Sequence, residues 1–228
     1  MNCKYICAPL CITAAAVVAV VGTMTIASAQ PGMDKAPAHA PTPSAPATGQ
    51  PEMKLPAGWT PADMQACMDA GTPGKMHEWL AKGAGVWHGK QTMWMAPGAE
   101  ALKSDCTSTI TPMMDGRYFK CEMAGEIPGM GPFNGFGLSG FDNVSQKFVG
   151  SWIDNHSTGI MTGTGELSSD QKTLTWTYAY NCPITKKPTV MREVDTFTGK
   201  DTMTMEMFGI EPKSGKEFKM LHIDFTKK

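Results

Sequence analysis

The sequence predicts a mainly β protein, a single antiparallel up-and-down β-barrel of about eight to ten strands with two short N-terminal helices. From Gly85 onward, apolar and polar residues alternate with a period of two, which is typical of strands with one buried face. Turn-forming clusters of Gly, Pro, Asp and Asn separate these segments, and no helix-length pattern interrupts them. A meander of this length would curl, and closure into a barrel would remove its unpaired edges.

Residues 1–29 have the features of an export signal peptide. Lys4 provides a short basic region, Leu10–Val21 is apolar, and Ala27-Ser28-Ala29 forms a cleavage site of small residues. The alternative is a retained membrane anchor, although the apolar run is interrupted and shorter than the ~20 residues of a span. No second long apolar run follows. We therefore expect an exported protein, periplasmic or extracellular, with no membrane association once the signal is removed.

The rest of the chain divides into a tether and one domain. Residues 30–58 are dominated by Pro, Ala, Thr and Gln, and lack the apolar content that would offset the entropy of ordering them. Residues 60–228 are long enough for one sizeable core. The formal net charge is −1 and no cluster of Lys and Arg stands out, so nucleic acid is not an expected partner. The sequence does not indicate an oligomeric state.

Two helices are expected ahead of the strands. Thr60-Pro61-Ala62-Asp63 combines an N-cap residue, a Pro at the first helical position and an acidic residue at the third. Gly71 can end this helix. Thr72-Pro73 then repeats the start pattern, and a second helix is expected to continue to Gly83.

The alternating segments define ten candidate strands and an apolar interior. In the seventh, Trp176 and Tyr178 share a face opposite Thr residues; in the ninth, Met side chains alternate with Thr. The interior should therefore be lined by Met and aromatic side chains. The strands are Val86–Trp94, Lys103–Thr111, Arg117–Gly125, Phe133–Phe141, Lys147–Asp154, Ile160–Leu167, Thr173–Tyr180, Val190–Thr198, Thr202–Phe208 and Glu217–Thr226.

Four blocks of this sequence resemble a bacterial family called domain of unknown function 1579: HEWLAKGAGVWHGK, DGRYFK, PFNGFGLSGFDNVSQKFVGSWIDNHSTGI and GKEFKMLHIDF. The resemblance covers roughly Met76 to Lys228 and implies an exported, calycin-like barrel. Gly85-Val86-Trp87 also resembles the lipocalin Gly-x-Trp, whose Trp closes the barrel floor against an Arg of the last strand. The last strand here has no Arg, so only the Trp is carried over.

The leading functional hypothesis is that the barrel lumen binds a small, largely apolar molecule. Gly150 would leave space for it beside the neighbouring side chains. Alternation groups Arg192 with Val190 and Val194 on the expected inner face, so the ligand should have one polar or acidic end. The candidate ligand-binding residues are Trp152, Asp154, Trp176, Tyr178, Arg192, Met203 and Met205.

Two alternatives belong to other classes of function. One is an enzyme that uses Asp154, His156 and Arg192 at the barrel mouth, although no catalytic motif supports it. The other is a structural or interaction module with a filled lumen. The Met residues could hold Cu(I), and His222 could be an axial ligand of haem. Packing explains the Met pattern, and His222 faces water if its neighbours face inward, so no metal or cofactor is expected.

Four Cys residues remain after the predicted signal: Cys67, Cys106, Cys121 and Cys182. An even number in an exported protein permits two disulfides. A symmetric hairpin centred between Met113 and Met114 would place Cys106 directly opposite Cys121, so the sequence predicts a disulfide between them. Cys67 and Cys182 would pair only by default.

The cleavage site makes a direct prediction about the exported protein. We expect the mature chain to begin at Gln30, because Ala27-Ser28-Ala29 follows the apolar run. N-terminal sequencing of secreted material checks this, and a chain that still begins at Met1 would contradict it.

Overall fold

A computed structural model describes residues 55–228, so the predicted signal peptide and most of the predicted tether lie outside the described residues. Two short helices, α1 (Pro61–Ala70) and α2 (Lys75–Ala81), precede ten strands. The strands are β1 (Gly85–Met93), β2 (Leu102–Met113), β3 (Tyr118–Ile127), β4 (Gly131–Asp142), β5 (Lys147–Asp154), β6 (Met161–Leu167), β7 (Thr173–Asn181), β8 (Pro188–Phe197), β9 (Thr202–Ile210) and β10 (Glu217–Lys227).

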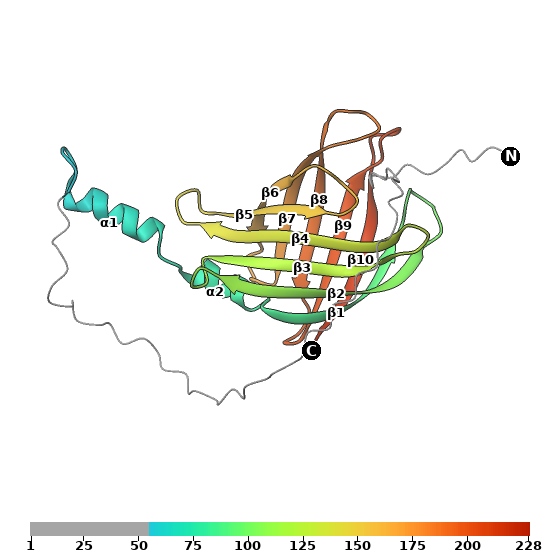
Figure 1. The fold of residues 1–228 in the computed structure, drawn as a ribbon, viewed down its shortest axis with the longest axis horizontal. Helices are drawn as coiled ribbons and strands as arrows, with labels where there is room; N and C mark the ends of the chain where they lie inside the picture. The colour runs from blue at the N-terminus through green and yellow to red at the C-terminus, as the bar shows by residue number, and fades with distance from the viewer. Residues whose placement is uncertain (1–54) are drawn as a thin grey trace, which may run out of the picture. The chain divides into compact units, whose positions relative to one another are not determined.

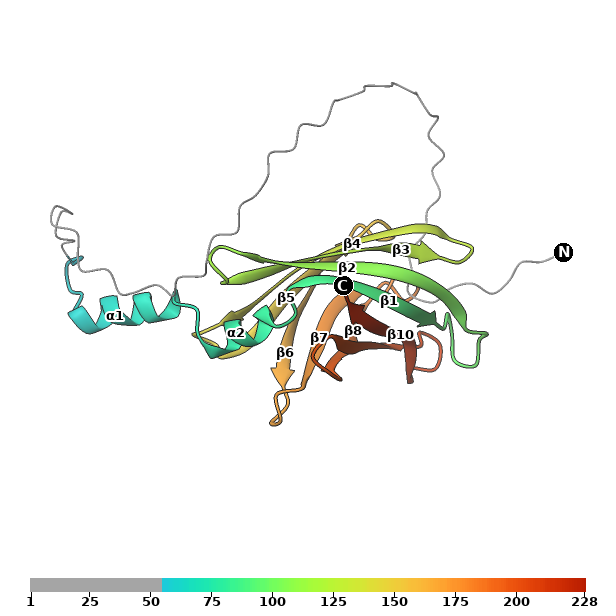
Figure 2. The same ribbon diagram turned by 90° about the horizontal axis from the view of Figure 1, so that it is seen from below.

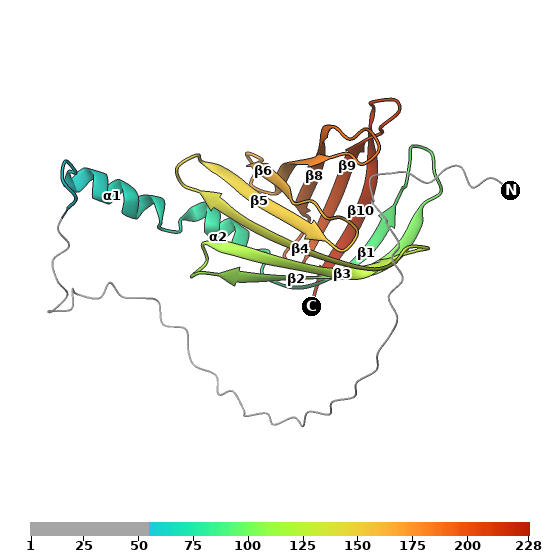
Figure 3. The ribbon, with the colours of Figure 1, turned by 45° about the horizontal axis from the view of Figure 1, so that its top comes forward.

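The ten strands form one closed antiparallel barrel, as predicted. Each strand pairs with its neighbours in the sequence, and β1 pairs with β10 to complete the ring (Figure 1). In that view β2–β5 cross β6–β10 at a steep angle, and Figure 3 shows β1 lying beside β10. Closure leaves no strand of the ring with an unpaired edge. Neither helix among residues 55–228 is long and apolar enough to cross a membrane.

Helix α1 begins where the sequence predicts, whereas α2 begins at Lys75 with Gly74 as its N-cap, two residues after the Thr72-Pro73 pattern, and ends at Ala81 before the expected Gly83. Thr60 caps α1: its backbone N–H and hydroxyl both donate to Asp63 Oδ2 over 2.7 Å, and its hydroxyl accepts from the Asp63 N–H. At the other end of α1, the Asn143 side chain donates to the Thr72 carbonyl over 2.8 Å. The Thr72 carbonyl lies just beyond the helix and has no N–H of a following helical turn to accept from, so the Asn143 amide supplies its hydrogen bond.

Helix α2 covers one end of the barrel (Figure 2). Its Trp79 ring packs edge-on against Phe148 of β5 and Phe197 of β8, with ring centres 5.7 and 5.5 Å apart. The Trp79 indole N–H donates to the Gln171 carbonyl over 2.8 Å. Trp79 is only 5% exposed and contacts β5, β8 and the turn before β7. Its side chain therefore closes this end of the barrel.

The core has two apolar clusters inside the barrel. The first cluster is built by β1, β2, β3, β9 and β10 around Trp87, Ile223 and Phe225. The second cluster is built by α2 and β5–β8 around Phe148 and Trp176. Phe197, Met207 and Met220 contact both clusters. Apolar side chains therefore line the inner face of the wall in both halves of the barrel, as the Met and aromatic pattern predicts.

The first strand contains a fully buried Trp87 that the last strand covers. Its indole N–H donates to the Gly83 carbonyl over 2.8 Å. Lys227 of β10 places its ammonium 5.1 Å from the ring centre and donates to the Lys82 carbonyl. In lipocalins, an Arg of the last strand packs against this Trp. Here Lys227 of the last strand lies against Trp87 instead and makes a cation–π contact with its ring.

The predicted Cys106–Cys121 disulfide is wrong. The β2–β3 register pairs Cys106 with Gly125 and Cys121 with Ile110, so the two residues are four positions out of register. The turn is centred between Asp115 and Gly116, two residues later than the symmetric hairpin assumed. All four described Cys residues are free, including Cys67 and Cys182.

We expect Cys106 and Cys121 to resist alkylation in the folded protein. Burial raises the pKa of each thiol to about 11, so the reactive thiolate is scarce at pH 8. Exposed Cys67 should react at once and serves as the internal control. Mass spectrometry of labelled protein before and after unfolding measures this. A Cys106–Cys121 cross-linked peptide in a non-reduced digest would contradict the register.

Candidate functional site

Two carboxyl groups lie inside the barrel, on the inner face of β8. Leu174, Trp176 and Tyr178 of β7 point inward, and their partners on β8 are Asp195, Glu193 and Met191. On the other side, Glu193 pairs with Met207 and Asp195 with Met205 of β9. Because strand side chains alternate between faces, both carboxyls lie on the same inner face as these apolar neighbours. They stand between the first and second apolar clusters.

Arg192 is on the outer face, which corrects its predicted place in the lumen. Its guanidinium makes a two-point ion pair with Glu217 of β10, with a shortest N–O distance of 2.7 Å. It also stacks over the Phe208 ring, 3.9 Å from the ring centre. Alternation was correct, but the face was wrong: the flanking Val190 is 47% exposed. The prediction of a ligand with an acidic end loses its basis.

The carboxyl pair has unusual electrostatics because it is enclosed with no counter-charge beside it among residues 55–228. Burial, followed by the charge of Asp195, raises the pKa of Glu193 well above its ordinary value. Burial also raises the pKa of Asp195 to about 7. The Trp176 indole N–H donates to Asp195 Oδ2 over 3.2 Å, which partly opposes that rise. Near neutral pH the pair therefore holds at least one proton.

One oxygen of the pair lacks a donor among the described residues. Asp195 Oδ1 is buried and accepts no hydrogen bond from residues 55–228. Burial and the neighbouring carboxyl both favour the protonated form of Glu193, so the pair retains a proton that one of the two groups can donate. A shared proton is one way to satisfy an oxygen that would otherwise carry the cost of desolvation.

Two further polar groups lie near this pair inside the barrel, Tyr178 on the adjacent strand β7 and Cys121 on β3. Burial is the main cause of the raised pKa of the Tyr178 hydroxyl and of the Cys121 thiol, and the Glu193 and Asp195 charges add to both. The Cys121 sulfur lies 3.3 Å from the Ser108 hydroxyl. The interior thus has a polar centre drawn from β2, β3, β7 and β8. The sequence analysis missed its two carboxyls because it assigned the wrong face of β8.

The predicted aromatic and Met residues all point inward, but they are spread over both clusters. Trp152, Met203 and Met205 contact the first cluster, and Trp176 and Tyr178 belong to the second. Their role in ligand binding stays a prediction. Trp152 and Met205 are half-buried, whereas Trp176 and Tyr178 are 4% and 8% exposed.

The space beside Gly150 is already occupied, contrary to expectation. A Cβ there would lie 3.0 Å from the Tyr178 hydroxyl and 3.1 Å from the Trp176 ring. Gly135 of β4 plays the same part for Trp152, whose ring would be 2.1 Å from an added Cβ. These inward glycines let large rings lie close against the wall. A bulky residue at position 150 would disturb the core as well as any ligand.

The loop after β5 is held by side-chain hydrogen bonds, several of which reach β4. Asp154 accepts from the Trp152 indole N–H over 3.2 Å and from the His156 backbone N–H over 2.9 Å. Asn155 accepts from the Asn134 N–H and donates to the Pro132 carbonyl. The His156 ring stacks on Phe133 with centres 5.8 Å apart. These polar groups fasten β5 to β4, and they do not converge with Arg192 as the enzyme hypothesis required.

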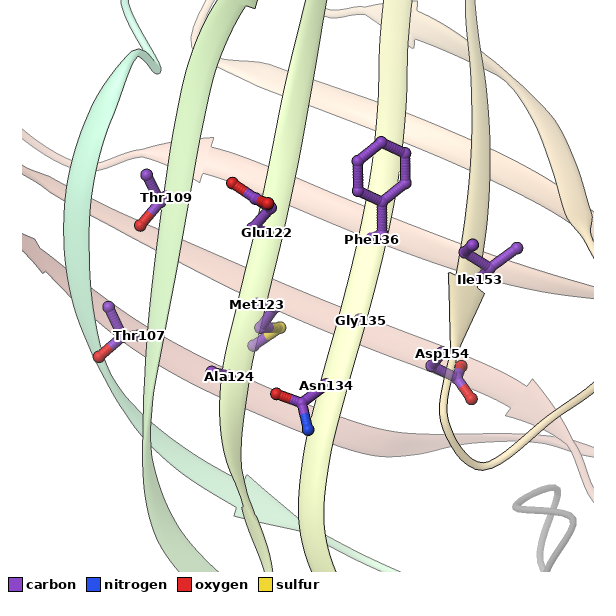
Figure 4. A pocket seen from close by; sticks show the side chains of 10 residues that line it. All are labelled: Thr107, Thr109, Glu122, Met123, Ala124, Asn134, Gly135, Phe136, Ile153 and Asp154. Atoms are coloured by element: carbon purple, nitrogen blue, oxygen red, sulfur yellow. The ribbon is translucent and has the colours of Figure 1, made fainter. Parts of the chain in front are cut away.

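A separate hollow of about 390 Å³ lies on the outer wall, across β2–β5 (Figure 4). Most of its lining side chains occupy the outward positions of these strands. Phe136 and Ile153 form an exposed apolar edge, and Glu122 and Asn134 supply polar groups. This hollow is distinct from the lumen, since the inward side chains Trp152 and Met205 do not line it.

The geometry of residues 55–228 gives little support to a metal site or to haem binding through His222. No three His, Cys, Asp or Glu side chains among residues 55–228 are grouped as metal ligands would be. His222 faces outward, as the alternation of β10 predicts. Its ring nitrogens lie 3.3 Å from a Glu206 oxygen and 3.2 Å from an Asp224 oxygen. It therefore belongs to a polar group on the outer surface and not to the lumen.

The family described as "Protein of unknown function (DUF1579)" matches residues 72–227, the range that contains α2 and all ten strands. The chain belongs to the DUF1579 family. No curated protein matches it.

Two solved structures are similar to this DUF1579 chain. The crystal structure of Rv2717c from M. tuberculosis has a TM-score of 0.50 and 12% identity, over 69% of this chain and 99% of that chain. A redesigned β-barrel has a TM-score of 0.37 and 10% identity, over 68% and 99% of the two chains. The first likeness concerns the fold alone, and the second is too distant to carry an argument.

The enclosed carboxyls predict how the stability of this DUF1579 barrel depends on pH. Their pKa values are raised in the folded state, so unfolding releases protons between about pH 4 and about pH 7. The pair's contribution to the free energy of unfolding should therefore fall as pH rises through that window. A Glu193→Gln/Asp195→Asn variant should lose less stability from pH 4.5 to pH 8, by a few kcal/mol at most.

Urea unfolding at the two pH values measures this difference. Cys121 and Tyr178, which face the pair, stay neutral in this range because their pKa values are raised. The exposed, outward Glu126 provides the matched control Glu126→Gln, which should follow the unsubstituted protein. Parallel pH profiles for all three proteins would show that the carboxyls are not desolvated.

Proposed function

We propose that this protein binds a small, largely apolar molecule in the barrel lumen. The observation that supports this most is that several inward side chains keep accessible surface inside a closed wall. Trp152, Met205 and Met207 are half-buried although they point inward. In a lumen filled to the density of a normal core, such side chains would be almost completely buried.

The size and closure of the barrel favour the same proposal. Barrels of about eight strands can already hold one small ligand, and the diameter grows with the number of strands. The ten strands here enclose a wider interior. Trp79 of α2 closes one end, so a ligand would enter at the opposite end, where the loops after β5, β7 and β9 lie. A mostly apolar pocket with a few polar groups is typical of small-molecule sites.

The alternative of a structural module with a filled lumen makes the opposite prediction. Native mass spectrometry of protein purified from its own host would detect a retained small molecule. A fluorescent apolar probe, N-phenyl-1-naphthylamine, provides a second test because its emission rises in apolar surroundings. If no molecule is retained and the probe shows no saturable binding, the binding proposal fails and the structural alternative replaces it.

Filling the lumen should remove binding. We expect Met205→Trp to lower the probe affinity at least tenfold, because a larger ring would occupy the space beside the half-buried Met205. Thr204→Trp is the matched control: it adds the same ring one residue away, on the outer face, and should leave the affinity unchanged. Circular dichroism checks the fold, and Met205→Phe replaces the first variant if it does not fold. Equal probe affinity in both Trp variants would place the binding site elsewhere.

A further inference from the structure

The strongest unassigned feature of residues 55–228 is a pair of acidic side chains inside the barrel that has no basic partner within this part of the chain. Glu193 and Asp195 point into the lumen from β8. The flanking strands β7 and β9 contain no Lys, Arg or His at all, and the one basic residue of β8, Arg192, is paired on the outer face. A buried carboxylate that lacks a protein partner is costly, and an added cation would offset that cost.

We propose that the lumen selects an amphiphilic molecule with a protonated amine, whose ammonium group is held by Glu193 and Asp195. This inference rests on the proposed function and names its ligand class. The unpartnered Asp195 Oδ1 is an acceptor for an ammonium N–H, and Glu193 supplies a second carboxyl group two residues away on the same face. An ammonium group donates up to three hydrogen bonds and accepts none, which matches a site of acceptors.

The surroundings of the carboxyls suit the rest of such a molecule. Met205 and Met207 of β9 lie opposite the two carboxyls and are half-buried, so an alkyl or aryl body can pack on them. Trp176 holds Asp195 in place through its indole N–H, and its ring offers an aromatic surface next to the cation. From Thr189 at the mouth to Glu193 the strand rises by ~13 Å, which leaves room for an extended apolar chain above the ammonium.

The pair's shared proton links binding to charge. With one proton held between them, the two carboxyls carry a single negative charge, which one entering ammonium group balances. Neutral or anionic analogues of the same shape obtain no such gain. An anionic head-group would meet repulsion from the pair, which excludes the acidic ligand that an inward Arg192 would have implied.

The test is competition against bound N-phenyl-1-naphthylamine at pH 7.5 with three probes of equal chain length: decylamine, 1-decanol and decanoate. An alkylamine is protonated at this pH, as a Lys side chain is. We expect decylamine to displace the probe at about 10- to 100-fold lower concentration than decanol, the range of a hydrogen bond to a charged group. Decanoate should compete most weakly.

The carboxyls are tested with the isosteric variant Glu193→Gln/Asp195→Asn, and Glu126→Gln on the outer face is the control. The double variant should still bind the neutral probe and should lose the preference for decylamine, while the control keeps both. If decanol or decanoate competes as well as decylamine, or if the double variant keeps the preference, the inference is wrong although the lumen binds. If the neutral probe does not bind the unsubstituted protein, the proposed function itself fails.

Discussion

The structure depends on one constraint: ten antiparallel registers close on themselves, so the inner or outer position of one side chain determines that of every other. β1 pairs with both β2 and β10, and no strand can slip by one residue without exchanging its faces. The inward glycines tighten this constraint. The Trp152 ring lies where a Cβ of Gly135 would be, and Trp176 and Tyr178 lie against Gly150 and its neighbours. Any register that moved these rings away from the glycines would produce clashes on one strand and voids on another.

Much of the barrel could be predicted from the sequence because its strongest strands have one polar and one apolar face. In β7, large side chains alternate with Thr, and in β9, Met alternates with Thr, so their inner faces follow from composition alone. β8 is different. Its outer face carries Val190, Arg192 and Val194, and its inner face carries Met191, Glu193 and Asp195, so each face holds both apolar and charged residues. Only the pairing with Trp176 decides the orientation, and pairing is a property of the assembled sheet.

The cysteine register shows the same limit at a turn. Asp115-Gly116 is a strong hairpin turn signal, and the hairpin is indeed centred there. Three consecutive residues, Met114, Asp115 and Gly116, have positive φ angles of 48°, 55° and 82°. A centre two residues earlier would have placed this left-handed backbone inside a strand. The Asp115-Gly116 turn signal therefore predicts the register of this hairpin correctly, whereas the symmetric placement of two cysteines predicts it wrongly.

A shift of one residue on β8 also reverses the chemistry of the lumen. With Arg192 inside, the interior would carry a positive group that suits an anion; with Glu193 and Asp195 inside, it carries acceptors that suit a donor or a cation. The Arg192–Glu217 ion pair helps to hold the observed face, since the stack on Phe208 keeps the guanidinium on the outer wall. The carboxyls in turn are a cost to the fold that burial and mutual repulsion both increase. Two such groups inside a largely apolar barrel lower the stability of the fold at positions where an amide or a Met would not carry this cost, and the proposed ammonium ligand would offset it.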